Sequence, residues 1–161
     1  MKPALRILSL LILVAIAVFY TSCGGDDNKK KTDEEVQLGK LKSVWTLVSA
    51  NDGQDRTGDF TNLKLTLEGN YVEGGTYNYS FTGHRPDPSP WPVEGTWKFG
   101  TNKLTDIIRD PGSQNEIAMN YQVTDGNLII TFNVQDGSDG WPGGDSRIRS
   151  VSGDWTFEFT K

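Results

Sequence analysis

The chain has 161 residues, a formal net charge of −5 and a hydrophobic content of 35%. This length and composition support one domain with one core. The excess of acidic residues disfavours nucleic-acid binding, because phosphates are also negative. Its single cysteine, Cys23, and single histidine, His84, exclude an intramolecular disulfide and a zinc site built from these residue types.

The first 22 residues predict an export signal. Lys2 and Arg6 form a basic start, and an apolar run of 13 residues, 7–19, follows them. That length is typical of a signal-peptide core, whereas a membrane-spanning helix needs about 20 residues. We therefore interpret residues 1–22 as a signal peptide.

The residues that precede Cys23 resemble a bacterial lipoprotein signal. Thr21 and Ser22 fit the pattern, although Tyr20 stands where leucine is usual. The resemblance implies cleavage before Cys23, which leaves an acylated cysteine as the first residue. It also implies a cell-envelope protein, and Gly24 favours the outer membrane, with the periplasmic or surface side left open. Residues 23–33 are too polar for a core and predict a flexible tether.

A single domain is expected over residues 34–161. Thr32 followed by three acidic residues predicts the start of a short helix that ends near Leu41. Alternating apolar and polar residues, interrupted by turn residues, then predict eight strands. The expected strands are 42–50, 60–67, 71–81, 93–99, 104–109, 117–123, 128–134 and 147–160.

Two turn signals sharpen this prediction. Asp125-Gly126 lies between two alternating runs and favours a type I′ hairpin, in which both central residues have positive φ. Gly74-Gly75 lies inside the third expected strand and suggests a bulge or a sharp bend. Because each strand is adjacent in sequence to the next, closing the sheet would protect its edges. We expect an all-β, antiparallel up-and-down barrel of about eight strands.

Several short pieces resemble the lipocalin-like domains of bacterial lipoproteins, in order and spacing across about 38–161. The matching pieces are 45–48, 65–71, 95–98, 102–104, and 121–123 with 128–130. The resemblance implies an eight-stranded barrel with an internal cavity. The glycine of the vertebrate lipocalin start motif is replaced here by Ser43, two residues before Trp45.

One face of the expected strands supplies candidate ligand-binding residues. They are Leu65, Tyr77, Tyr79, Trp97, Ile107, Met119, Tyr121, Ile130 and Phe132, with Trp155 and Phe157 on the same face. They could line an apolar pocket in which tyrosine hydroxyls contact a ligand. An ordinary packed core explains the same alternation, and the sequence favours that interpretation.

Trp91 and Trp141 lie outside the strands, in loops rich in proline and glycine. Exposed tryptophans would form a carbohydrate- or protein-binding surface or a lid over the barrel. Alternatively, each tryptophan folds back to anchor one end of the barrel. The sequence does not distinguish the two arrangements.

No set of residues predicts catalysis, a metal or a cofactor. His84 lies in a proline-rich loop without an evident nucleophile. Asp136, Ser138, Asp139 and Asp145 could offer oxygen ligands to calcium, but their spacing does not match a calcium loop and turn formation explains them better. We therefore expect a non-enzymatic, lipid-anchored barrel that binds a small apolar or amphipathic molecule. The alternatives are a surface-binding module and a structural envelope protein with a filled barrel.

Overall fold

A computed structural model of the chain describes residues 30–135 and 151–161. One compact unit extends from Lys31 to Lys161. The expected signal peptide, Cys23, Trp141 and the acidic loop 136–145 lie outside the described residues. Within the described ranges, no helix has both the length and the apolar character needed to span a membrane.

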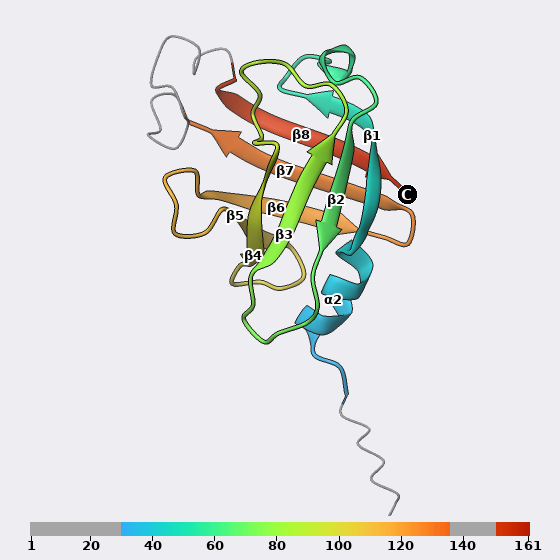
Figure 1. Cartoon of the computed structure of the whole chain (residues 1–161), viewed down its shortest axis with the longest axis vertical. Coiled ribbons are helices and arrows are strands. Elements are labelled where there is room, and N and C mark those ends of the chain that lie inside the picture. Colours follow the sequence, from blue (N-terminus) through green and yellow to red (C-terminus); the bar gives the residue numbers. More distant parts are fainter. Residues whose placement is uncertain (1–29, 136–150) are drawn as a thin grey trace, which may run out of the picture. The chain divides into compact units, whose positions relative to one another are not determined.

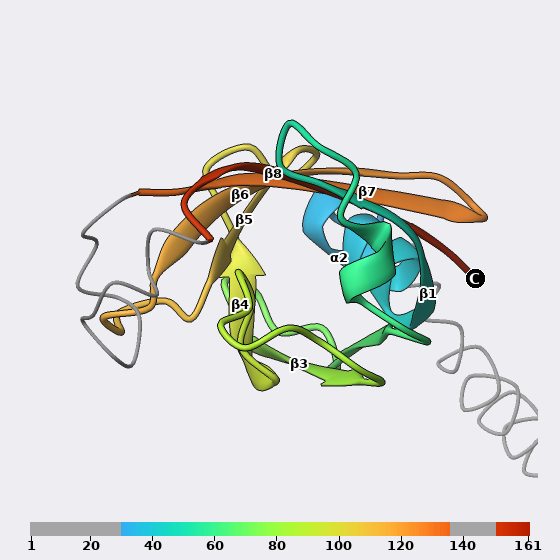
Figure 2. The same cartoon turned by 90° about the horizontal axis from the view of Figure 1, so that it is seen from above.

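Eight antiparallel strands form a closed barrel in which each strand pairs with its neighbours in sequence and the last pairs with the first (Figures 1 and 2). This arrangement confirms the expected all-β up-and-down barrel and the helix before it. The elements are α2 (Asp33–Leu41), β1 (Ser43–Asn51), the 3₁₀ helix η1 (Thr57–Asp59), β2 (Lys64–Glu68), β3 (Tyr77–Thr82), β4 (Glu94–Phe99), β5 (Asp106–Arg109), β6 (Ile117–Val123), β7 (Asn127–Val134) and β8 (Gly153–Thr160).

Helix α2 closes one end of the barrel, as Figure 2 shows. It begins at Asp33 because the Thr32 hydroxyl accepts a hydrogen bond from the Glu35 amide at 3.1 Å. Leu38 and Leu41 are buried in the core. In β1, the indole of Trp45 donates to the Leu41 carbonyl at 2.8 Å. The helix is thereby fixed to the first strand by packing and by a buried hydrogen bond.

The interior is built from side chains that alternate along the strands. In β8, Trp155, Phe157 and Phe159 are buried, and the residues between them are more exposed. Their neighbours across the β7–β8 pair include Leu128, opposite Phe159, and Phe132, opposite Trp155. Burying one such side chain stabilises a fold by about 1.5–3 kcal/mol, so this alternation drives closure of the sheet.

The expected third strand is too long at its start. Strand β3 begins at Tyr77, and residues 71–76 form a connection. Gly74 has φ +64°, and the Gly75 amide donates to the Val72 carbonyl at 2.8 Å, so these residues form a turn and not a bulge within a strand. A shift in strand register, of the kind that a bulge produces, occurs instead in β1. Its pairing with β8 shifts between Leu47 and Ser49.

The second and last strands also begin later than expected. Strand β2 begins at Lys64, because η1 and the left-handed backbone of Asn62, φ 55°, interrupt the extended chain. Phe60 and Leu63 are nevertheless buried in the core. Strand β8 begins at Gly153, and residues 147–150 of the expected strand lie outside the described ranges.

The hairpin at Asp125-Gly126 lies where it was expected, but its turn type was predicted wrongly. Neither central residue has positive φ, which type I′ requires. The Thr124 amide donates to the Asn127 carbonyl at 2.9 Å and closes the turn. The pair Asp-Gly therefore located the reversal of the chain without specifying its backbone conformation.

Candidate functional site

The ligand-binding candidates lie together inside the barrel. All of them are buried in one hydrophobic cluster, which confirms the face assigned to each strand: Leu65, Tyr77, Tyr79, Trp97, Ile107, Met119, Tyr121, Ile130, Phe132, Trp155 and Phe157. Their rings pack against one another, for example Phe157 on Phe132 with centroids 5.9 Å apart and on Trp155 at 5.6 Å. These contacts are those of a packed interior.

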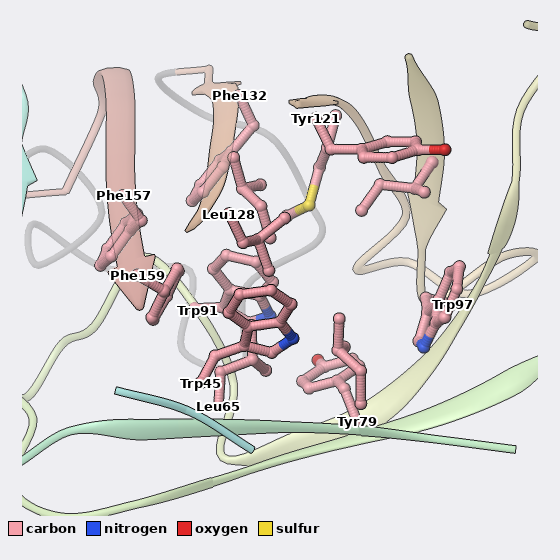
Figure 3. Packing of buried hydrophobic residues seen from close by; sticks show 14 of the residues in the cluster. Trp45, Leu65, Tyr79, Trp91, Trp97, Tyr121, Leu128, Phe132, Phe157 and Phe159 are labelled. Atoms are coloured by element: carbon pink, nitrogen blue, oxygen red, sulfur yellow. The ribbon is translucent and has the colours of Figure 1, made fainter. Parts of the chain in front are cut away.

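Trp91 occupies this interior as well, so its expected exposure in the surface-binding alternative is wrong. It is 3% exposed. Its ring contacts Phe81 at 5.1 Å, Phe132 at 5.3 Å and Phe157 at 5.8 Å between centroids, each edge to face. Figure 3 shows it among these core side chains. The indole folds inward because aromatic rings from β3, β7 and β8 surround it on several sides.

Arg109 is the residue that sequence reasoning missed. Its side chain is 1% exposed. Nη1 donates to the Pro90 carbonyl at 3.1 Å and Nη2 to the Asn115 carbonyl at 3.3 Å. Burial lowers the pKa of Arg109, whereas Tyr79 and Asp110 act in the opposite direction. Side chains two residues apart in a strand lie on the same face. Because Ile107 was expected to face inward, the sequence could have indicated the same orientation for Arg109.

Asp110 connects this guanidinium to β3 and β4. Its Oδ2 lies 3.3 Å from Arg109 Nε and accepts a hydrogen bond from the Tyr79 hydroxyl at 2.9 Å. Its Oδ1 accepts from the Thr96 amide at 2.9 Å. Burial raises the pKa of Tyr79 far above its usual value, and the charge of Asp110 adds to the rise while Arg109 opposes it. The Tyr79 hydroxyl therefore remains a hydrogen-bond donor at neutral pH.

Two donors in this region lack hydrogen bonds among the described residues. They are the indole Nε1 of Trp91 and Nε of Arg109, although the latter is held in the ion pair with Asp110. A buried donor without an acceptor is destabilising by about 1–3 kcal/mol. The region thus combines aromatic surfaces with polar groups whose hydrogen-bonding capacity is only partly used.

Some of the described residues form surface hollows on the outside of the barrel. One, of about 370 Å³, is lined by outward-facing residues of β2, β3 and β4 that include Thr66, Asn78 and Thr96. Another, of about 250 Å³, lies over β6 and β7. The described residues contain no group of three or more His, Cys, Asp or Glu side chains arranged for a metal ion. The polar groups that do converge are those around Arg109.

Comparisons with known proteins give no family for this chain. No family model, no curated protein and no solved structure matches it. The functional argument therefore rests on the residues of the barrel. Chemically, the cluster of Arg109, Asp110, Tyr79 and Trp91 offers hydrogen-bond donors beside aromatic rings.

Proposed function

We propose that this chain is a lipid-anchored lipoprotein of the bacterial cell envelope, at the outer membrane, and that its lipocalin-like barrel binds a small apolar or amphipathic molecule without catalysis. Residues 1–22 and Cys23 support the anchor. The closed barrel supports binding, because an eight-stranded barrel can enclose one small ligand. The polar tether 23–33 would hold the barrel near the membrane.

The observation that carries the binding proposal is the buried charge of Arg109. Removing a charge from water costs several kcal/mol even when it is paired, and a barrel that only needs a filled core can use an apolar side chain there. Small-molecule sites combine apolar walls with a few polar groups that orient the ligand. The guanidinium, the Tyr79 hydroxyl and the surrounding rings form such a combination.

A structural envelope protein with a filled barrel is the second candidate. The packing of Trp91 against Phe81, Phe132 and Phe157 favours it, because the indole occupies interior space. In that case the hydrogen bonds from Arg109 to Pro90 and Asn115 only hold two loops over the barrel end. Ligand binding distinguishes the two candidates.

The binding proposal is tested by titrating the purified full chain with a dansyl-labelled fatty acid. We expect saturable, blue-shifted fluorescence, and at least about tenfold weaker binding by Arg109→Lys, because lysine lacks the planar fork that bonds two oxygens. Arg56→Lys is the control, since Arg56 pairs with Asp52 on the surface. Without saturable binding by the native chain, the filled-barrel candidate is preferred.

The anchor is tested separately by growing bacteria that express the chain with labelled palmitate. The native protein should incorporate the label and sediment with membranes, because acylation would occur at the Cys23 thiol. Cys23→Ala should lose the label. Incorporation that persists in this variant would contradict the proposed anchor.

A further inference from the structure

Residues 85–92, here called the Trp91 segment, connect β3 to β4 across the end of the barrel opposite α2 (Figure 1). The chain is fixed on both sides of this segment. His84 donates its amide to the Thr61 carbonyl at 2.9 Å, and Phe81 donates its amide to the Val93 carbonyl at 2.7 Å. The ends of the connection therefore belong to the barrel wall.

The segment itself is held weakly by hydrogen bonds. In the described part of the chain, its one well-formed hydrogen bond to residues outside 84–93 is accepted by the Pro90 carbonyl from Arg109 Nη1 at 3.1 Å, and the Trp91 indole N–H also lies close to the Tyr79 hydroxyl. The other two bonds are internal, from the Arg85 guanidinium to the Trp91 carbonyl and from the Trp91 amide to the Ser89 hydroxyl. Outward movement of the segment would therefore break one well-formed hydrogen bond to the barrel and separate the indole N–H from the Tyr79 hydroxyl.

The buried side chains of Trp91, Pro90 and Ser89 account for the remaining attachment, and the indole is the largest of them. It lies among Phe81, Phe132 and Phe157, and its centroid is 6.0 Å from that of Tyr79. Its Nε1 is buried and forms no well-aligned hydrogen bond among the described residues, although the Tyr79 hydroxyl lies close to it. Exposure to water would satisfy this donor, so part of the free energy lost when the indole leaves the core would be recovered.

We propose that the Trp91 segment occupies the ligand site as an internal plug, and that the ligand is an aromatic bicyclic compound bearing a carbonyl oxygen. This inference rests on the proposed binding function. The indole would be replaced by the aromatic part of the ligand, and the Pro90 carbonyl by its oxygen at Arg109 Nη1. A neutral carbonyl is sufficient there, because Asp110 already balances the charge of Arg109.

N-acetyltryptophan amide reproduces both groups, since its acetyl carbonyl precedes the tryptophan as Pro90 precedes Trp91. The full-length variant Trp91→Ala lacks the indole that competes for the site. A site that is blocked most of the time binds its ligand with reduced apparent affinity. We expect the variant to bind N-acetyltryptophan amide at least about tenfold more tightly than the native chain in calorimetry, and N-acetylleucine amide to bind neither.

Trp155→Ala is the matched control. Trp155 is also a buried tryptophan, but it belongs to β8 and its Nε1 donates to the Val151 carbonyl at 2.8 Å. Equal gains in affinity for both variants would mean that any cavity accepts an indole, and would overturn the proposal. If Trp91→Ala does not fold, Trp91→Phe replaces it, since the smaller ring still leaves part of the site open.

A measurement on the native chain tests displacement directly. Fluorotryptophan gives one fluorine signal for each of the five tryptophans, and Trp91→Phe identifies that of Trp91. Saturation with N-acetyltryptophan amide should move this signal toward the position of a solvent-exposed indole. If the dansyl fatty acid binds while this signal stays unchanged and Trp91→Ala gains no affinity, the plug is refuted and the binding function stands. If no probe binds any of these chains, both proposals fail.

Discussion

Arg109 places a positive charge inside an otherwise apolar barrel. Its guanidinium lies over the Phe132 ring, 6.0 Å from the centroid, and pairs with Asp110 at 3.3 Å. A buried ion pair of this kind is not in itself stabilising relative to apolar packing. Loss of one partner is different, because the other charge then remains buried without compensation.

We therefore expect Arg109→Met to lower the free energy of unfolding by about 3–5 kcal/mol, the range found when a buried pair loses one member. Urea unfolding of the native and variant chains measures this change. The control is Arg56→Met. Arg56 lies 3.0 Å from Asp52 but is partly exposed, so its loss should change stability by less than about 1 kcal/mol. If both variants lost the same free energy of unfolding, the charge of Asp110 would be solvated or balanced by another group in the absence of Arg109.

Trp91 shows where sequence reasoning about the site stops. A tryptophan between prolines has no periodicity, so composition alone could not decide between an exposed platform and a buried anchor. Its burial depends on rings from β3, β7 and β8 that are distant in sequence. By contrast, the inward orientation of Tyr79, Met119 and Phe132 followed from alternation within single strands.

Among the elements, β4 is in close contact at Gly95 with the side chains of Asp110 and Tyr79. A Cβ at this position would lie in severe overlap with Asp110 Oδ1 and 2.7 Å from the Tyr79 hydroxyl. The absence of a side chain thus lets Asp110 reach both Tyr79 and the Thr96 amide. Glycine is needed here for space and not for a special φ.

Gly95→Ala should accordingly destabilise the fold by about 1–3 kcal/mol, as overpacking of a closed site does. Gly126→Ala is the matched control, because a Cβ there would meet no atom within 4 Å and its φ is not in the left-handed region. We expect that change to stay within about 0.5 kcal/mol in urea unfolding. A neutral Gly95→Ala would mean that Asp110 can move aside without loss.

The number of strands, their order and their inward faces could be predicted from the sequence, since period-two patterns are local. Most strand boundaries were also predicted to within two residues, and those of β6 without error, but the starts of β2, β3 and β8 were not. Positive φ at Gly74 and Asn62 ends extended structure within segments whose composition still resembles a strand. The turn at Asp125-Gly126 adopts another type, although β6 and β7 pair on either side of it as expected.

At the scale of the whole barrel, different elements close the two ends. Helix α2 covers one end, and its Leu38 and Leu41 join the core, while the connection that carries Trp91 crosses the other end. The α2 end is further fixed by the Trp45–Leu41 hydrogen bond and by Lys161, whose Nζ lies 4.9 Å from the Trp45 ring centroid. A ligand would therefore enter at the Trp91 end, where a connection carries the filling side chain.

Methyl NMR of the native chain, titrated with the dansyl fatty acid and with N-acetyltryptophan amide, tests most directly whether a ligand enters the barrel. Met119 and Ile130 report on the interior, and the exposed Val44 and Val48 report on the outer surface. We predict saturable shifts of the Met119 and Ile130 methyl signals while those of Val44 and Val48 stay in place. Shifts confined to the two valines, or no shifts at saturating probe, would contradict binding inside the barrel.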